Sequence, residues 1–401
     1  MGEHSREDVA RRAGVETDYI DHLVDLGLLK PGRSGLFSSG DVRRARWVLG
    51  LERSGVSLDG MATAVRDGIL SFTFLDAGAF DRFSGVSDMT FRQLSARTGI
   101  PLELLMLIRE ALGFAVPRPD DRVRDDELSV VSAIEAQLSS GYRPVAIEQW
   151  LRVCGDSLRR ITGTETGWYQ SEVMQPLLDA GMTEEKMQET QAELGSRISP
   201  LMDEALVAIY HGQQEHAWTR SLVEHVEDVL EGAGLHRRLH RPPAVSFLDI
   251  TGYTRLTEER GDEAAAELAA RLGTLVRRSS QEHGGQPVKW LGDGVMFLFP
   301  DPGQGVLAAL DMVEGVTSQD LPPAHVGIHA GRVVFQEGDY FGRTVNIASR
   351  IADYARPGEI LVTQEVVEAA GEAPVAFTEV GPVELKGVSG TLRLHSAQRA
   401  G

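Results

Sequence analysis

Two aspartates lie where the sequence otherwise predicts buried β-strands. Asp249 comes near the end of the apolar run 244–250, and Asp293 separates the apolar runs 287–291 and 294–299. A carboxylate beside a buried strand is costly unless it is paired or bound to a metal ion. Two aspartates on neighbouring strands suit Mg²⁺, which takes oxygen ligands and keeps coordination positions open for phosphate oxygens. The alternative is that each aspartate only caps a turn or a helix.

Two further segments have the chemistry to bind phosphates. After the expected strand 244–250, a glycine permits close backbone approach and a helix is expected to begin, so free N–H groups there suit a phosphate. The residues concerned are Thr251, Gly252 and Tyr253. Asn346 and Arg350, four positions apart, share one face of a helix predicted from residue 345. Arginine offers phosphate oxygens a planar fork, and asparagine orients an oxygen by hydrogen bonding. Each segment alone is also typical of a plain turn or a solvated helix face.

Three motifs in order resemble the catalytic domain of class III nucleotidyl cyclases. They are SFLDITGYT (246–254), VKWLGDGVMFLF (288–299) and DYFGRTVNIASR (339–350). The resemblance covers about residues 244–396 and includes VELKGVSGTLRL (383–394) near the end. It implies an α+β catalytic domain of the ferredoxin-like type.

The resemblance implies a role for a set of polar side chains, all of which are present. These are metal binding by Asp249 and Asp293, base recognition by Lys289 and Asp339, ribose orientation by Asn346 and transition-state stabilisation by Arg350. Ile250 is also assigned to the metal site, which takes two ions, Mg²⁺ or Mn²⁺. Lysine donates and aspartate accepts, which complements N1 and the exocyclic amine of adenine. Guanine presents the reverse pair, and each unsatisfied buried group costs about 1–3 kcal/mol. We therefore expect ATP to be preferred over GTP.

The reaction implied by this resemblance is cyclisation of ATP. The ribose 3′-oxygen attacks the α-phosphorus in line, pyrophosphate leaves, and 3′,5′-cyclic AMP forms. In the family, the metal residues come from one catalytic domain and the base-reading and transition-state residues from a second. Because this chain holds one such domain with a complete set, we expect a homodimer with two sites.

The pattern around these motifs alternates between strands and helices, which predicts a mixed α/β sheet. Strands are expected at 244–250, 287–291, 294–299, 324–335 and 359–363, with two more near 383–396. Helices are expected at 258–280, 303–315 and from 345. The turn between 287–291 and 294–299 contains Gly292 and Asp293, residue types that tolerate positive φ.

Composition excludes several classes of protein. The chain has 401 residues, with 40 Lys and Arg against 59 Asp and Glu, and a net charge of −19. This charge argues against nucleic-acid binding by the whole molecule. The single cysteine, Cys154, excludes a disulfide within the chain and a cysteine metal cluster. No apolar run suits a membrane span or a signal peptide, so we expect a cytoplasmic protein.

The first part of the chain contains two copies of one helical unit. Residues 5–15 align with 90–100, and 51–68 align with 136–155. Each copy opens with a capping signal, Ser5 before Asp8 and Thr90 before Gln93, followed by a helix, a glycine turn and a second helix. The expected domains are a MerR-like helix-turn-helix (1–75), a second repeat (88–160), a helical regulatory and dimerisation linker (161–240) and the cyclase domain (241–401). The N-terminal half is expected to be all-α.

DNA binding by the first repeat is disfavoured by its charges. Residues 5–70 resemble the MerR-type winged helix-turn-helix, but the helix that would enter the major groove carries four carboxylates: Glu16, Asp18, Asp21 and Asp25. A small basic patch of Arg43, Arg44 and Arg46 is possible on a later helix. Packing or sensing is the preferred role for both repeats.

Residues 88–235 are similar to the regulatory half of actinobacterial pH-responsive cyclases. A long helix is expected near 196–231, ending at 232–234, and its apolar residues suggest a dimer contact. Five histidines lie between 211 and 240: His211, His216, His225, His236 and His240. They are either a pH switch or ordinary exposed helix histidines.

The leading hypothesis is a homodimeric adenylate cyclase controlled by a helical N-terminal half. One alternative is a DNA-binding transcriptional regulator whose cyclase-like domain only senses a nucleotide. The other is a guanylate cyclase, which Lys289 and Asp339 oppose.

Overall fold

The computed structural model describes residues 4–76, 85–235, 242–253, 258–259, 261–319, 321–371 and 373–400. It divides into two compact units, Met1–Glu224 and His225–Gly401. Residues 236–241, at the expected boundary between the linker and the cyclase domain, lie outside the described residues. Within the described ranges, no helix is both long and apolar enough to cross a membrane.

The first repeat begins with a capped helix, as predicted. The helices are α1 (Arg6–Ala13), α2 (Thr17–Asp25), α3 (Ser39–Arg53) and α4 (Leu58–Arg66), followed by the short 3₁₀ helix η1 (Thr73–Asp76). The Ser5 side chain accepts from the Asp8 backbone and Asp8 accepts from the Ser5 backbone, so the capping box is confirmed. Gly14 ends α1 with φ of 74°, a left-handed conformation that favours glycine.

The second repeat has a matching series of helices. They are α5 (Phe91–Thr98), α6 (Leu102–Ala111), α7 (Asp125–Ser139) and α8 (Pro144–Trp168). Thr90 and Gln93 form the predicted capping box, and Gly99 ends α5 with φ of 72°. The expectation of an all-α half is wrong in one detail, because β1 (Val86–Thr90) and β2 (Arg122–Arg124) pair antiparallel. These short extended segments flank helices, and pairing satisfies their backbone groups.

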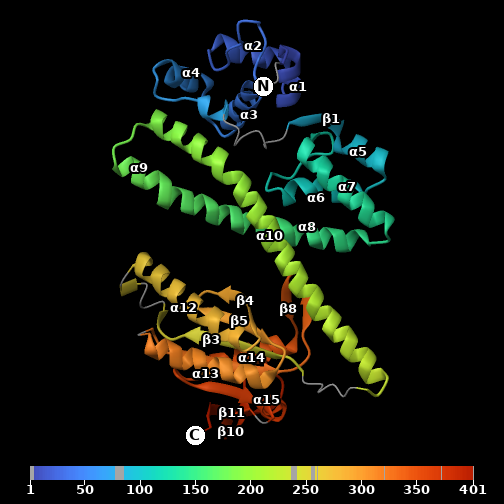
Figure 1. The fold of residues 1–401 in the computed structure, drawn as a ribbon, viewed down its shortest axis with the longest axis vertical. Coiled ribbons are helices and arrows are strands. Elements are labelled where there is room, and N and C mark those ends of the chain that lie inside the picture. The colour runs from blue at the N-terminus through green and yellow to red at the C-terminus, as the bar shows by residue number, and fades with distance from the viewer. Residues whose placement is uncertain are drawn as a thin grey trace. The chain divides into compact units, whose positions relative to one another are not determined.

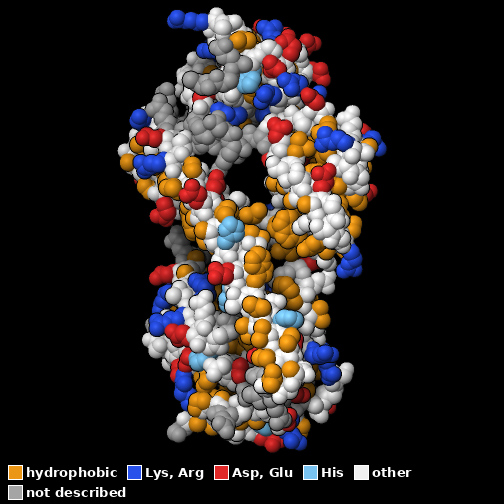
Figure 2. Space-filling model, turned by 45° about the vertical axis from the view of Figure 1, so that its right-hand side comes forward, with side chains coloured by type: hydrophobic (Ala, Val, Ile, Leu, Met, Phe, Trp, Pro, Cys, Tyr) orange, Lys and Arg blue, Asp and Glu red, His pale blue; other side chains and the backbone are white. Residues whose placement is uncertain are grey.

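Long helices complete the N-terminal part of the chain (Figure 1). After α8 come the π-helical turn η3 (Tyr169–Met174), α9 (Gln175–Asp179) and a break at Gly181, which has φ of 75°. The helix α10 then runs Glu184–Gly232 and ends where predicted. Large apolar side chains of α10 are exposed, including Ile209 at 64% and Trp218 at 69%, and they form a band in Figure 2.

The C-terminal unit is built on a seven-stranded sheet with the order β10-β11-β9-β6-β3-β5-β4. The strands are β3 (Ala244–Ile250), β4 (Gln286–Leu291), β5 (Gly294–Phe299), β6 (Ala324–Ala330), β9 (Ile360–Thr363), β10 (Val375–Glu384) and β11 (Thr391–Arg399). All pairs are antiparallel except β6 with β9. The helices are α12 (Asp262–Glu282), α13 (Pro302–Ser318), α14 (Arg343–Tyr354) and α15 (Gln364–Ala370). The series β3-α12-β4-β5-α13-β6 has the βαββαβ order of a ferredoxin-like fold.

The predicted single strand over 324–335 is wrong, since the chain forms β6 and then a separate hairpin. This hairpin consists of β7 (Val334–Gln336) and β8 (Asp339–Phe341). Glu337 in its turn has φ of 52°, and Gly338 follows with φ of 78°. The hairpin brings Asp339 to the start of α14, so it helps to position the predicted base-reading residue.

Helices cover both faces of the sheet. On one face, Ala244 and Leu248 of β3 pack in a core with α12 and α13, as Leu272 and Val306 show. On the other, Val245 packs with α14 through residues such as Ala348. Because β3 is buried on both faces, it reads as a continuous apolar run rather than an alternating one.

Candidate active site

The two predicted metal-binding carboxylates lie at adjacent strands. Asp249 is on β3, and Asp293 is in the turn that precedes β5. These strands pair with Leu248 opposite Val295, so the turn lies beside the end of β3. A Cβ added at Gly294 would lie 3.4 Å from Oδ1 of Asp249 and 3.2 Å from the Leu248 carbonyl oxygen. Glycine at this position therefore leaves room for the Asp249 carboxylate.

The pKa of Asp249 reports the proximity of these charges. Burial raises this pKa above its ordinary value, and the negative charge of Asp293 raises it further. His325 and the backbone N–H of Ile250 act in the opposite direction. Two partly buried carboxylates that repel each other are a suitable environment for a divalent cation, which would lower this repulsion.

Asp249 and Asp293 are the two carboxylates predicted to bind such a cation. Among the described residues, no group of three or more His, Cys, Asp or Glu side chains could hold a metal ion. Ile250, also predicted at the metals, has an apolar side chain, so only its backbone carbonyl could contribute. The donor set fits a hard ion that takes its other ligands from substrate phosphates and water.

His325 is a site residue that the sequence interpretation missed. It lies on β6 directly opposite Asp249, and its Nε2 is 3.6 Å from Oδ2 of Asp249. Its Nδ1 is 3.3 Å from Oγ1 of Thr251. The side chain is only 12% exposed. The pairing of β3 with β6 brings these residues together, and no motif in the sequence signals that pairing.

Lys289 and Asp339, the two predicted base-reading residues, form an ion pair with each other. Nζ of Lys289 lies 2.5 Å from Oδ2 of Asp339, and both side chains are partly buried. The other carboxylate oxygen of Asp339 accepts from the Tyr340 backbone N–H at 2.8 Å, which fixes its orientation. The ring of Phe341 lies 5.9 Å from Nζ of Lys289. Strand β4 and the β7–β8 hairpin thus supply a preformed donor and acceptor side by side.

Asn346 and Arg350 occupy the exposed face of α14, as their spacing predicts. The opposite face buries Ile347 and Ile351. Nη1 of Arg350 is 2.7 Å from Oδ2 of Asp353 on the same helix. Within the part of the chain that the structure describes, Asn346 and Arg350 make no hydrogen bond to the aspartates of β3 and the β4–β5 turn.

The predicted phosphate segment is only partly free. The backbone N–H of Thr251 donates to the Pro323 carbonyl at 2.9 Å, so it is not available to a phosphate. The Tyr253 hydroxyl donates to the Ala265 carbonyl on α12 at 3.2 Å, and the ring packs on the core. Gly252 is exposed with φ of 81°. Residues 254–257, where the helix was expected to continue, lie outside the described residues.

Two family models match the chain and divide it as the fold does. Residues 237–397 match the adenylate and guanylate cyclase catalytic domain, and residues 33–216 match the adenylate cyclase regulatory domain. The fold and site therefore define a nucleotidyl cyclase catalytic domain preceded by a helical regulatory domain.

Relatives extend this match over both domains. The chain is 31% identical to the pH-sensitive adenylate cyclase MT1302 of Mycobacterium tuberculosis over 318 residues, 77% of each chain. It is 27% identical to an adenylate cyclase of Streptomyces coelicolor, covering 69% of this chain and 70% of the relative. The chain belongs to the class III adenylate cyclase family.

Two solved cyclase structures each align with about two fifths of this chain. The adenylyl cyclase CyaB from P. aeruginosa aligns with a TM-score of 0.35 and 23% identity, covering 39% of this chain and 94% of that chain. The guanylyl cyclase Cya2 aligns with a TM-score of 0.35 and 24% identity, covering 40% of this chain and 93% of that chain.

Proposed function

We propose that this chain converts ATP into 3′,5′-cyclic AMP and pyrophosphate at a site shared by two copies of the chain. The observation that carries the proposal is the Lys289–Asp339 pair, at 2.5 Å, in a domain that also holds the Asp249 and Asp293 carboxylates. The six predicted polar residues supply recognition, orientation and charge neutralisation. The reaction needs no covalent intermediate on the enzyme.

Base recognition uses the preformed pair. Without a nucleotide, Lys289 and Asp339 satisfy each other. An adenine ring inserted beside them accepts a hydrogen bond from Lys289 and donates one from its amine to Asp339. Because both side chains are already oriented, little ordering is needed on binding. Guanine leaves both groups mispaired, which supports ATP over GTP as the substrate.

The carboxylates would hold the divalent cations. Asp249 and Asp293, with the Ile250 carbonyl, would be the ligands of the two metal ions, Mg²⁺ or Mn²⁺. Bound metal would lower the pKa of the ribose 3′-hydroxyl and neutralise the triphosphate. His325 orients the Asp249 carboxylate, while the exposed Gly252 offers its backbone N–H group to phosphate. Asn346 orients the ribose, and Arg350 neutralises charge that develops on the phosphate oxygens.

The way the site residues are divided supports a homodimer. In the described residues of one chain, the Lys289–Asp339 pair has no hydrogen bond to Asp249 or Asp293. Apolar side chains next to that pair in sequence are exposed, with Trp290 at 40% and Phe341 at 48%. A second catalytic domain on this surface would cover them and bring metal ligands to the base-reading pair. The Arg350 side chain would then leave Asp353 and bind a phosphate oxygen of the substrate.

The helical half is proposed to regulate this assembly. For the two repeats we propose a packing or sensing role in preference to DNA binding, and α10 carries the exposed apolar band that suits a dimer contact. His211, His216 and His225 of α10 are exposed. A pH response through them stays a hypothesis, as do residual DNA binding and a cytoplasmic location. His236 and His240 lie outside the described residues.

Product formation tests the proposal. The purified full chain should form cyclic AMP from ATP with Mg²⁺ or Mn²⁺, and much less cyclic GMP from GTP. Asp293→Ala should abolish product formation while leaving the circular dichroism spectrum unchanged. Absence of any cyclic nucleotide under all of these conditions would overturn the proposal, and cyclic GMP as the main product would overturn the assignment of the base-reading pair.

A further inference from the structure

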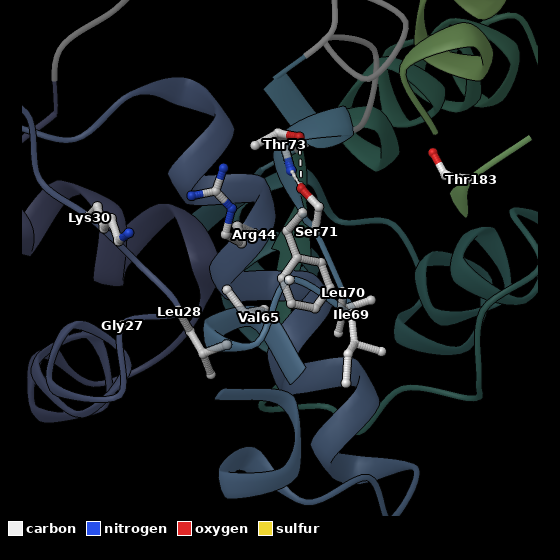
Figure 3. Close-up of a pocket in the computed structure, with 12 residues that line it drawn as sticks. Gly27, Leu28, Lys30, Arg44, Val65, Ile69, Leu70, Ser71, Thr73 and Thr183 are labelled. Carbon is white, nitrogen blue, oxygen red and sulfur yellow. Dashed lines mark hydrogen bonds between the residues drawn. The ribbon is translucent and has the colours of Figure 1, made fainter. Parts of the chain in front are cut away.

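Two cavities of ligand size in the described part of the N-terminal unit are lined by arginine side chains. The first, about 510 Å³, is lined by Lys30 and Arg44 and by apolar residues such as Leu28 and Leu70 (Figure 3). Arg44 lies 3.0 Å from Asp41 and 3.2 Å from Asp76, so two carboxylates already neutralise it. The second cavity, about 470 Å³, differs in that one of its arginines, Arg46, has no carboxylate partner among the described residues.

This second cavity is named here the arginine cavity. It lies between α3 and the second repeat and is lined by Arg43, Arg46, Trp47, Phe114 and Arg124. The small basic patch considered from the sequence is thus divided, since Arg44 lines the other cavity while Arg43 and Arg46 line this one. Three arginines converge here in a chain whose net charge is −19, so general basicity of the protein does not explain them.

Arg46 is the arginine whose charge lacks a partner. Among the described residues it makes no hydrogen bond and no ion pair, although it is partly buried. Burial lowers the pKa of Arg46, and the positive charge of Arg124 lowers it further, while Asp125 and Asp126 attract Arg46 only at longer range. A guanidinium withdrawn from water without a compensating anion is unfavourable.

Two carboxylates of this region are already engaged by other arginines. Asp126 lies 2.6 Å from Arg124, and Glu127 lies 2.6 Å from Arg109. Arg43 is held by a hydrogen bond from its Nε to the Leu75 carbonyl at 2.7 Å. Arg43 and Arg124 are therefore fixed in place around Arg46, which is the side chain able to bind an added anion.

The cavity also offers flat apolar surfaces. Trp47 is 45% exposed and Phe114 is 45% exposed. The Arg124 guanidinium lies 4.1 Å from the centroid of the Phe114 ring, a cation–π contact that fixes both groups. Trp47 remains available for stacking against a planar ring, which is a sequence-tolerant way to bind a nucleobase.

We propose that the arginine cavity binds a phosphorylated small molecule with a planar ring, of the mononucleotide class. The Arg46 guanidinium binds the phosphate through two parallel hydrogen bonds, supported by Arg43 and Arg124. The ring lies against Trp47. A cavity of about 470 Å³ is within the usual range for small-molecule sites. This site is separate in sequence from the catalytic residues, and the inference does not depend on the proposed cyclase activity.

The test is calorimetric titration of 5′-AMP into the full chain in EDTA. The parent chain and every variant in this comparison carry Lys289→Ala, so that base recognition in the catalytic domain does not contribute to the measured binding. We expect one binding site per chain, and at least tenfold weaker binding when Arg46→Gln is added. Arg46→Lys keeps the charge but not the planar fork and should have an intermediate effect. Arg53→Gln, also on α3 but exposed and outside the cavity, should leave binding unchanged.

Control ligands and the melting temperature of Arg46→Gln separate nucleotide binding in the cavity from general anion binding and from a purely structural role of Arg46. Adenosine should not bind, because it lacks the phosphate, and inorganic phosphate should bind more weakly than 5′-AMP. Without ligand, Arg46→Gln should melt at the same temperature or higher, since it removes an uncompensated charge. The proposal is overturned if 5′-AMP does not bind, if Arg46→Gln binds it as well as the parent chain, if phosphate alone binds equally well, or if Arg46→Gln melts well below the parent.

Discussion

Nζ of Lys289 lies 2.5 Å from Oδ2 of Asp339, which joins strand β4 to the β7–β8 hairpin across 50 positions of sequence. The pair presents one donor and one acceptor on neighbouring backbone segments. This relationship is the structural basis for expecting adenine, rather than guanine, in the catalytic domain.

Asp339→Asn tests base selectivity. The amide cannot reproduce a carboxylate that accepts from the adenine amine while paired with Lys289. Loss of one charge-assisted hydrogen bond, about 1.5–3 kcal/mol, predicts a fall in kcat/KM for ATP of about 10- to 100-fold. Steady-state rates with ATP and GTP measure it, with Glu337→Gln in the same hairpin as the control. An unchanged ratio of the two rates would show that this pair does not read the base.

Asp249→Asn tests the repulsion between the two carboxylates. The pKa of Asp249 is higher in the folded chain than in the unfolded chain. The ionised carboxylate therefore destabilises the fold. This destabilisation is absent below the unfolded-state pKa and grows as the pH rises through the folded-state pKa. In EDTA at neutral pH, Asp249→Asn should therefore raise the melting temperature. The gain should correspond to at most about 1 kcal/mol, because solvent screens a partly exposed carboxylate. It should disappear in acid, and a loss of stability at neutral pH would contradict the repulsion. With metal and ATP, the same variant should be inactive.

His325→Gln tests the residue that faces Asp249 from β6. Loss of an outer partner typically weakens metal affinity about 10- to 100-fold. We expect a rise of that order in the Mn²⁺ concentration needed for half-maximal activity, and weaker Mn²⁺ binding by calorimetry without nucleotide. His283→Gln, at the end of α12, is the control. Equal metal affinity in His325→Gln and the parent chain would rule out a positioning role.

Gly327→Ala tests how α14 is held. A Cβ at this position of β6 would lie 2.1 Å from the Ala352 backbone nitrogen and 2.7 Å from the Ala348 carbonyl oxygen. Since backbone cannot yield as a side chain can, α14 must shift together with Asn346 and Arg350. We expect a loss of stability of about 1–3 kcal/mol, typical of overpacking, and at least tenfold lower kcat. Gly273→Ala on α12 meets only the end of the Arg277 side chain and should be neutral or stabilising. If Gly327→Ala and Gly273→Ala have the same melting temperature and the same kcat, the close packing of Gly327 against α14 does not hold this helix in place.

The sequence predicts the local features of this protein well. Capping boxes at Ser5 and Thr90 depend on residues three positions apart, so they are readable without any tertiary information. Strand β3 and the turn at Asp293 follow from apolar runs and a Gly-Asp turn. The base-reading roles of Lys289 and Asp339 are predicted from a family resemblance and not from spacing, while the ion pair between them is found only in the structure.

Features that depend on the pairing of distant segments were missed. His325 reaches Asp249 only because β6 pairs with β3 in one register. The β1–β2 pair joins segments too short to show a strand period. The division of Arg43, Arg44 and Arg46 between two cavities follows from the packing around α3, which its helical period does not reveal.

The central claim is that two copies of this chain build an ATP-cyclising site between them. The most direct test mixes two variants, each inactive alone: Asp293→Ala, which lacks a metal ligand, and Lys289→Ala, which lacks a base-reading residue. After exchange, half of the dimers are mixed and one of their two sites is intact, which predicts about a quarter of the parent rate of cyclic AMP formation. A mixture as inactive as its components, with exchange of subunits demonstrated, would contradict the shared site.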